Sequence, residues 1–81
     1  MTELQKKVGV KISHLRTKNN YKQKELAIAI GCSTQHIGLI ETGRNKPNID
    51  TLYQICAVLK CDIADLLPSI NDLTPSDFNV L

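Results

Sequence analysis

The 81-residue sequence lacks the features of membrane and secreted proteins. No run of apolar residues is long enough to cross a bilayer. The N-terminal residues are polar, and their apolar positions are spaced apart where a signal peptide would need a continuous apolar stretch. These absences predict a cytoplasmic protein that makes no membrane contact.

The sequence also lacks the residue patterns of common catalytic sites. It has no glycine-rich phosphate loop, and no nucleophile stands at a recognisable spacing from a base and an orienting residue. No set of side chains has metal-ligand spacing. We therefore expect neither an enzyme nor a protein that binds a metal or another cofactor.

Cysteine is scarce, and its count is odd. Three cysteines in a chain without a secretion signal argue against a disulfide framework. Cys32, Cys56 and Cys61 are therefore predicted to be free and mostly buried thiols. A zinc site that adds His36 lacks the paired short spacings of structural zinc sites. Redox sensing by an exposed Cys32 remains an alternative.

Charge is distributed unevenly along this short chain, which is long enough for one small domain with a thin core. Residues 1–46 hold nine basic and three acidic side chains, a net charge of +6. Residues 47–81 hold one lysine and five aspartates, a net charge of −4. This asymmetry is expected when one face meets phosphates. A solvated surface with chance clustering is the alternative.

The central stretch, residues 22–41, predicts two short helices joined by a turn. Apolar residues recur at helical spacing on both sides of the turn: Leu26, Ala27 and Ile30, then Ile37 and Ile40. Gly31 stands where helices commonly end in a left-handed conformation. Ser33 offers a side-chain oxygen to the first amides of the next helix. Two helices joined in this way are typical of helix-turn-helix proteins, whose second helix enters the major groove of DNA.

This stretch resembles the Cro/phage-repressor-type helix-turn-helix, also called the xenobiotic-response-element family. The residues that carry the resemblance are Gln23, Leu26-Ala27, Gly31, Ser33 and Ile40-Glu41-Thr42-Gly43. The resemblance extends from about residue 8 to residue 67. It implies an all-α, five-helix, phage-repressor-like DNA-binding domain with the helix-turn-helix at its second and third helices.

Capping residues and apolar spacing place the five helices. They are predicted from Thr2 to about Lys18, from Lys22 or Gln23 to Gly31, from Thr34 to about Thr42, from Asn48 through Leu59, and from Asp62 to Pro68. Thr2 and Gln5 have the spacing of a capping box, and Asp62 is expected to cap the fifth helix. In that helix Ile63, Leu66 and Leu67 are expected to pack inward. Gly9 lies inside the first helix, where the resemblance implies that it permits close packing.

The second helix departs from the family pattern at its first residue. Lys22 occupies a cap position that the family usually gives to Ser or Thr, and lysine cannot accept amide hydrogen bonds. Loss of this cap would cost about 1 kcal/mol. Lys22 would instead be available to a DNA phosphate.

The residues expected to face base edges are Thr34, Gln35, Gly38 and Leu39. Gln35 can bond both N6 and N7 of adenine, and Leu39 can contact a thymine methyl group. His36 either reaches a phosphate or is a half-buried surface histidine. This reading surface is sparse, so we expect modest sequence specificity with a contribution from DNA shape.

The resemblance implies the remaining contacts. Gln23 resembles a glutamine that bonds the phosphate backbone, and the loop at Arg44 runs along that backbone in the family. The complete predicted DNA-binding set is Lys22, Gln23, Ser33, Thr34, Gln35, His36, Gly38, Leu39, Thr42, Arg44, Asn45 and Lys46. The resemblance also implies an ion pair between Arg16 and Glu41 that ties the first helix to the end of the third. A solvent-exposed Arg16 is the alternative.

The resemblance divides the chain into a DNA-binding domain, residues 1–68, and a C-terminal tail, residues 69–81. The tail is either disordered or an arm that folds onto its own or a partner subunit, because Phe78, Val80 and Leu81 gain by leaving water. The implied function is a sequence-specific double-stranded DNA-binding regulator of transcription, a repressor that binds a near-palindromic operator as a homodimer. The alternatives are an antitoxin-type module that neutralises a partner toxin through the tail, and a restriction-modification controller protein.

Overall fold

The computed structural model describes residues 2–78 and contains five α-helices. They are α1 (Glu3–Lys18), α2 (Gln23–Ile30), α3 (Thr34–Glu41), α4 (Ile49–Leu59) and α5 (Ile63–Leu66), followed by the 3-10 turns η1 (Ile70–Asp72) and η2 (Pro75–Phe78). The described residues contain no strand, so the expected all-α, five-helix fold is confirmed. Within this range no helix is long and apolar enough to span a membrane.

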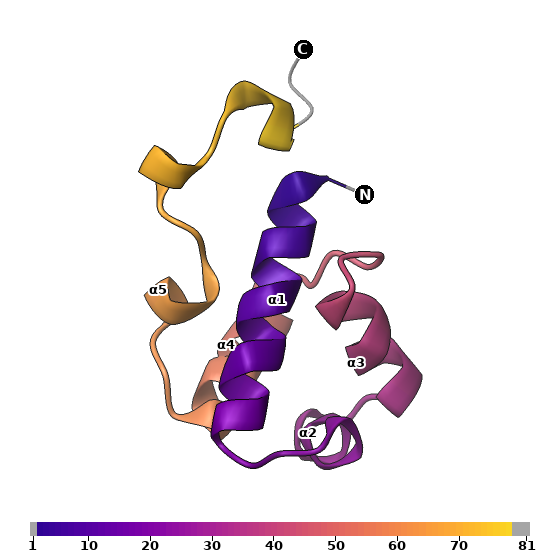
Figure 1. Ribbon diagram of the computed structural model, residues 1–81. Helices are drawn as coiled ribbons and strands as arrows, with labels where there is room; N and C mark the ends of the chain where they lie inside the picture. Colours follow the sequence, from indigo (N-terminus) through magenta and orange to yellow (C-terminus); the bar gives the residue numbers. More distant parts are fainter. Residues whose placement is uncertain (1, 79–81) are drawn as a thin grey trace.

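Helix α1 crosses the middle of the molecule and organises the others (Figure 1). The α2–α3 pair packs against one side of it, and α5 with the C-terminal turns lies on the other. Helix α4 packs on α2 and α5. The apolar stripes of all five helices meet in one core of Val8, Ile12, Leu26, Ala27, Ile37, Ile40, Ile55, Cys56, Leu59 and Leu66.

The helix starts follow the local capping chemistry. The amide of Gln5 donates to Thr2 Oγ1 (3.1 Å), and the amide of Thr2 donates to Gln5 Oε1 (3.2 Å). Ser33 and Asn48 cap α3 and α4 through their side-chain oxygens. In each of these caps the donor and the acceptor belong to residues three positions apart, so the local sequence determines the cap.

Two helix starts lack a side-chain cap from their first residue. Lys22 caps nothing, as expected, but its own amide donates to Glu25 Oε1 at 2.7 Å. Asp62 is the N-cap residue of α5, as predicted, although no amide of the helix donates to its carboxylate. Its own amide donates to Asp65 Oδ2 at 3.0 Å.

The prediction that Leu67 packs inward was wrong. Helix α5 ends at Leu66, and Leu67 has extended backbone angles (φ −107°, ψ 135°). The change of conformation takes its side chain off the buried face of the helix, and 39% of Leu67 is exposed. Leu66 is completely buried, and Ile63 is half-buried against the core.

Gly9 is the point of closest approach between α1 and the end of α3. A Cβ at this position would lie 2.6 Å from the carbonyl oxygen of Ile40 and closer still to that of Glu41. The expected role of Gly9 in close packing is therefore confirmed. Gly43, which has a left-handed φ of +82°, makes a second close contact, because a Cβ there would lie 2.8 Å from Lys6 Cα.

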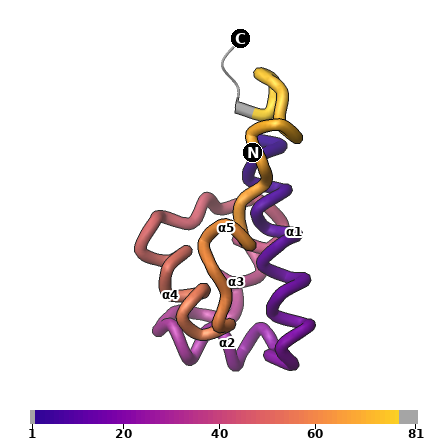
Figure 2. Tube along the Cα trace, turned by 90° about the vertical axis from the view of Figure 1, so that its left-hand side faces the viewer, coloured from indigo at the N-terminus to yellow at the C-terminus, as the bar shows by residue number. Residues whose placement is uncertain are grey.

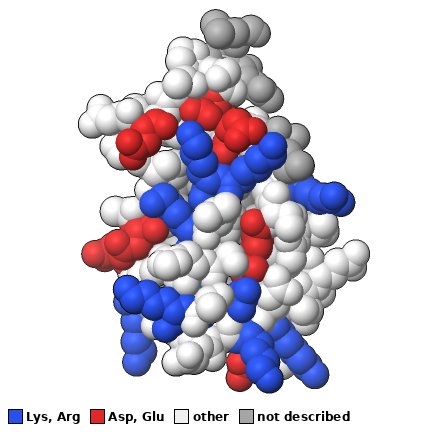
Figure 3. Space-filling view, viewed as in Figure 1, with Lys and Arg blue, Asp and Glu red and all other residues white. Residues whose placement is uncertain are grey.

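The C-terminal turns fold back along the N-terminal half of α1 (Figure 2). Lys7 Nζ lies 3.4 Å from both carboxylate oxygens of Asp77 and donates to the carbonyl oxygen of Asp72 (3.3 Å). Acidic and basic side chains accordingly meet at the upper end of the molecule in Figure 3. The described part of the tail thus lies on its own subunit, while Val80, Leu81 and the side chain of Phe78 fall outside the described residues.

The three thiols are free. Cys56 is buried, and Cys32 and Cys61 are half-buried. Burial raises the pKa of Cys32, which makes its reactive thiolate form less abundant. The described residues contain no cluster of three or more side chains able to hold a metal ion.

Candidate nucleic-acid interface

Helix α3 buries one side and exposes the other. Ile37 and Ile40 are each 1% exposed and hold the helix in the core. Thr34 and Gln35, in its first turn, are both exposed. The first turn of α3 is therefore presented outward on a helix that is fixed from behind.

A shallow groove runs along the exposed side of α3. Seven residues line it: Gln23, Thr34, Gln35, Gly38, Leu39, Thr42 and Arg44. They come from the start of α2, the length of α3 and the loop that follows. All seven belong to the set predicted from the sequence, so the fold brings most of that set into one continuous surface.

A charged network anchors the far end of α3. Arg16 donates to Glu41 through Nε (2.6 Å to Oε2) and through a terminal nitrogen (3.2 Å to Oε1). The other terminal nitrogen donates to the carbonyl oxygen of Tyr21 at 2.7 Å. The Arg16 and Glu41 side chains are only 14% and 6% exposed. An ion pair that has two hydrogen bonds and little exposure to solvent holds its two side chains in a fixed relative orientation.

Gln23 joins this network. Its amide nitrogen donates to Glu41 Oε1 at 2.9 Å. A Cβ added to Gly38 would lie 4.0 Å from that same nitrogen, so the end of the Gln23 side chain lies close to the glycine in the groove. The bond between Gln23 and Glu41 was not foreseen, because the two residues are 18 positions apart. It orients the Gln23 amide at the groove floor.

The loop after α3 folds back onto that helix. The amides of Arg44 and Asn45 both donate to the carbonyl oxygen of Leu39, at 2.9 and 3.1 Å. Gln5 of α1 donates to the carbonyl oxygen of Gly43 (3.2 Å) and holds the loop from the other side. Arg44 is thereby placed at the end of the groove.

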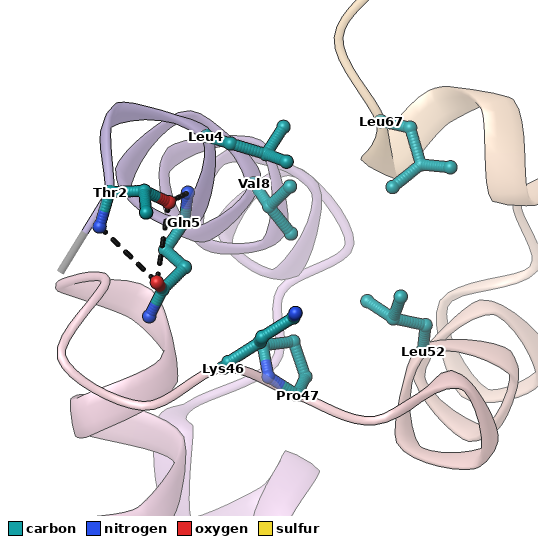
Figure 4. A pocket seen from close by; sticks show the side chains of 8 residues that line it. All are labelled: Thr2, Leu4, Gln5, Val8, Lys46, Pro47, Leu52 and Leu67. Atoms are coloured by element: carbon teal, nitrogen blue, oxygen red, sulfur yellow. Dashed lines mark hydrogen bonds between the residues drawn. The ribbon is translucent and has the colours of Figure 1, made fainter. Parts of the chain in front are cut away.

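Lys46 lies elsewhere. Together with Pro47 it borders an apolar hollow between the start of α1, the start of α4 and Leu67 (Figure 4). The structure therefore separates Lys46 from the groove that contains Arg44. Lys46 is exposed and Asn45 is half-buried.

The other predicted residues border the groove or its ends. Ser33 is exposed and caps α3, while Thr42 ends that helix and its hydroxyl donates to the carbonyl oxygens of Gly38 and Leu39. His36 is half-buried. Lys22 is exposed at the start of α2.

The helix-turn-helix family profile HTH_3 matches residues 12–66, which include the whole of α2, α3 and α4. The chain belongs to the HTH_3 helix-turn-helix family. The resemblance to Cro/phage-repressor-type proteins is thus confirmed, and this is a family of DNA-binding regulators of transcription.

Relatives in this family include regulators and a phage protein. The chain is 29% identical over 75 residues to the uncharacterised HTH-type transcriptional regulator y4dJ of Sinorhizobium fredii, covering 93% of this chain and 90% of that protein. It is 36% identical over 58 residues to the ImmF control region 10 kDa protein of Bacillus phage phi105, covering 72% and 64%. Among solved structures, the clp gene regulator ClgR of Corynebacterium glutamicum superposes with a TM-score of 0.75 at 25% identity, covering 78% and 67%.

Proposed function

We propose that this HTH_3 protein is a sequence-specific repressor that reads double-stranded DNA with the exposed side of α3. The observation that carries the proposal is the outward presentation of Thr34 and Gln35 on a helix whose opposite side is buried. In helix-turn-helix proteins the first residues of the second helix contact base edges. The fold leaves this part of α3 uncovered by other described residues.

In this proposal, four residues on the exposed side of α3 contact the bases. Gln35 hydrogen-bonds adenine, Thr34 bonds a base or contacts a thymine methyl, and Leu39 makes an apolar contact. Gly38 lets the backbone approach the bases closely. With one side chain able to make a paired hydrogen bond, specificity is modest and DNA shape contributes to it.

Phosphate contacts flank the reading helix. Lys22 at the start of α2 and Arg44 at the end of the groove supply positive charge, and the Gln23 amide in the groove donates a hydrogen bond to a phosphate. The remaining predicted contacts are Ser33, His36, Thr42, Asn45 and Lys46. These contacts set position and affinity without reading sequence. Each phosphate that a basic residue neutralises makes the slope of log affinity against log salt concentration more negative by about 0.9.

The protein acts as a homodimer in this proposal. Ile49 and Tyr53 stand four residues apart on α4 and are 68% and 57% exposed, so they form an apolar strip that a second copy would cover. A twofold dimer would place two α3 helices about 34 Å apart, in successive major grooves of a near-palindromic site.

Residues 1–68 form the DNA-binding domain in this proposal, and residues 69–81 form an arm. The described turns of the arm contact α1 of the same subunit through Lys7. This packing supports an arm that packs on its own subunit, and it argues against a segment that is free to bind a toxin. The name of the phage phi105 relative, which refers to a control region, supports a regulatory role.

Selection of bound oligonucleotides from a random pool tests the proposal. The expected product is a near-palindrome whose half-sites are about 10 base pairs apart, bound with an affinity that falls steeply as salt is added. A Gln35→Ala variant should select a relaxed site, while Gln54→Ala on the exposed side of α4 should select the wild-type site. Recovery of no consensus, or salt-insensitive binding, would refute the proposal.

A further inference from the structure

Two of the three cysteines meet where α4 ends. Cys56 lies in the last turn of α4, and Cys61 follows the helix by two residues. Between them Lys60 adopts a left-handed conformation with φ +55°. The amide of Cys61 donates to the carbonyl oxygen of Cys56 at 3.1 Å.

This bond, from the sixth residue of the turn back to the first, is the longer of the two bonds that define a Schellman helix end. Its first and last side chains commonly contact each other across the loop. Here those two side chains are both thiols. Both belong to the apolar core or pack against it, Cys56 with 6% exposure and Cys61 half-buried.

The neighbouring thiol also affects the titration of Cys56. Burial raises the pKa of Cys56 to about 11, and the nearby Cys61 thiol contributes to the increase. Cys32 has no such neighbour among the described cysteines; its thiol donates to the carbonyl oxygen of Ser33 at 3.6 Å.

We propose that Cys56 and Cys61 form a dithiol oxidation site that hydrogen peroxide converts into an intramolecular disulfide. The more exposed Cys61 reacts first, and its thiolate displaces hydroxide from the peroxide to give a sulfenic acid. The Cys56 sulfur then attacks the sulfenic sulfur, and the departing hydroxide leaves as water with the Cys56 proton. Two thiols and one peroxide thus give one disulfide and two waters.

The turn favours this second step over further oxidation of Cys61. The left-handed residue and the closing backbone bond already hold the loop in a tight conformation, so the resolving thiol is positioned before the oxidant arrives. Burial of Cys56 slows its own reaction with peroxide, because its thiolate is scarce. The two cysteines therefore have different roles, Cys61 as the reacting thiol and Cys56 as the resolving one.

Intact-mass measurement of the full-length protein after treatment with hydrogen peroxide tests the site. The expected result is a monomer lighter by two hydrogen atoms, restored by dithiothreitol. Alkylation after unfolding should then label Cys32 alone. Cys32→Ser is the matched control and should show the same loss of mass.

The variants at the site should behave differently from the control. Cys61→Ser should lose the lighter monomer completely, and Cys56→Ala, which keeps the core apolar, should instead add oxygen at Cys61. Circular dichroism confirms that each variant is folded. The proposal is overturned if wild-type protein gains oxygen atoms without forming the disulfide, if Cys61→Ser still loses two hydrogens, or if the disulfide maps to Cys32.

Discussion

Substituting Gly9 tests how α1 and α3 are held together. Considered as a helix residue alone, Gly9→Ala should stabilise the protein by up to about 1 kcal/mol. The new Cβ would however lie 2.6 Å from the carbonyl oxygen of Ile40 and closer to that of Glu41. These are backbone atoms, so no side-chain rotation relieves the contact. The helices would have to separate by about 1 Å to reach the ordinary carbon contact distance of ~3.5 Å.

Overpacking of this kind costs about 1–3 kcal/mol in a rigid core. The cost should lie in the upper part of that range, because the loop after α3 also packs tightly on α1, where a Cβ on Gly43 would lie 2.8 Å from Lys6 Cα. After the gain in helix propensity, we expect Gly9→Ala to destabilise the protein by about 1–2 kcal/mol. For a domain of this size that lowers the melting temperature by about 4–16 °C.

Gly38→Ala is the matched control, since Gly38 also lies inside a helix. A Cβ there meets only Gln23 Nε2, at 4.0 Å, an ordinary contact. This variant should gain stability by about 0.5–1 kcal/mol. Urea unfolding followed by far-ultraviolet circular dichroism compares the stabilities of the two variants. If Gly9→Ala and Gly38→Ala shift the midpoint of urea unfolding in the same direction, the close packing at Gly9 does not govern the stability of the fold.

Three further predictions concern the anchor, the reading surface and the arm. Arg16→Ala leaves the Glu41 carboxylate buried without its charged partner, although the Gln23 amide still donates to it, so the substitution should cost up to about 3–5 kcal/mol and also lower DNA affinity; wild-type melting and binding would contradict this role. Gln35→Ala should weaken binding to the selected site by about 1–3 kcal/mol, measured by fluorescence anisotropy, with little change on unrelated DNA. The hydrogen bond from the Thr74 amide, followed by the charge of Lys7, lowers the pKa of Asp77. The stabilisation from Asp77 is thus present above its unfolded pKa and is lost as pH falls through the lowered folded pKa. Asp77→Asn should speed amide exchange in residues 70–77 at pH 7 and match wild type in strong acid; equal exchange at pH 7 would argue against the anchor.

The parts of the fold that the sequence predicts well are those determined by neighbouring residues. The capping box at Thr2 and Gln5 and the left-handed stop at Gly31 involve groups no more than a few positions apart. The error at Leu67 has another cause. The fifth helix is a single turn, and the residue at which so short a helix ends depends on packing against α1 and α4.

In the candidate site, too, features set by neighbouring residues are predictable and contacts between distant residues are not. Helical spacing alone was enough to predict which side of α3 faces outward, and the resemblance was enough to pair Arg16 with Glu41. The bonds from Gln23 to Glu41 and from Gln5 to the carbonyl of Gly43 could not be predicted, because they join residues 18 and 38 positions apart. Such contacts depend on how α1 crosses the helix pair, and no local pattern encodes that crossing.

These long-range contacts are concentrated at one end of the reading helix. Gly9 and Arg16, both on α1, contact the last residues of α3, and Gln5 holds the loop beyond it. Among residues 2–78, the first turn of α3 is held by the Ser33 cap and by the buried side of the helix. Helix α1 therefore sets the direction in which α3 projects while leaving the first turn free to meet a ligand. Substitutions on α1 that touch no DNA should for this reason change affinity through the orientation of α3, whereas substitutions at Thr34 and Gln35 should change specificity with little effect on stability.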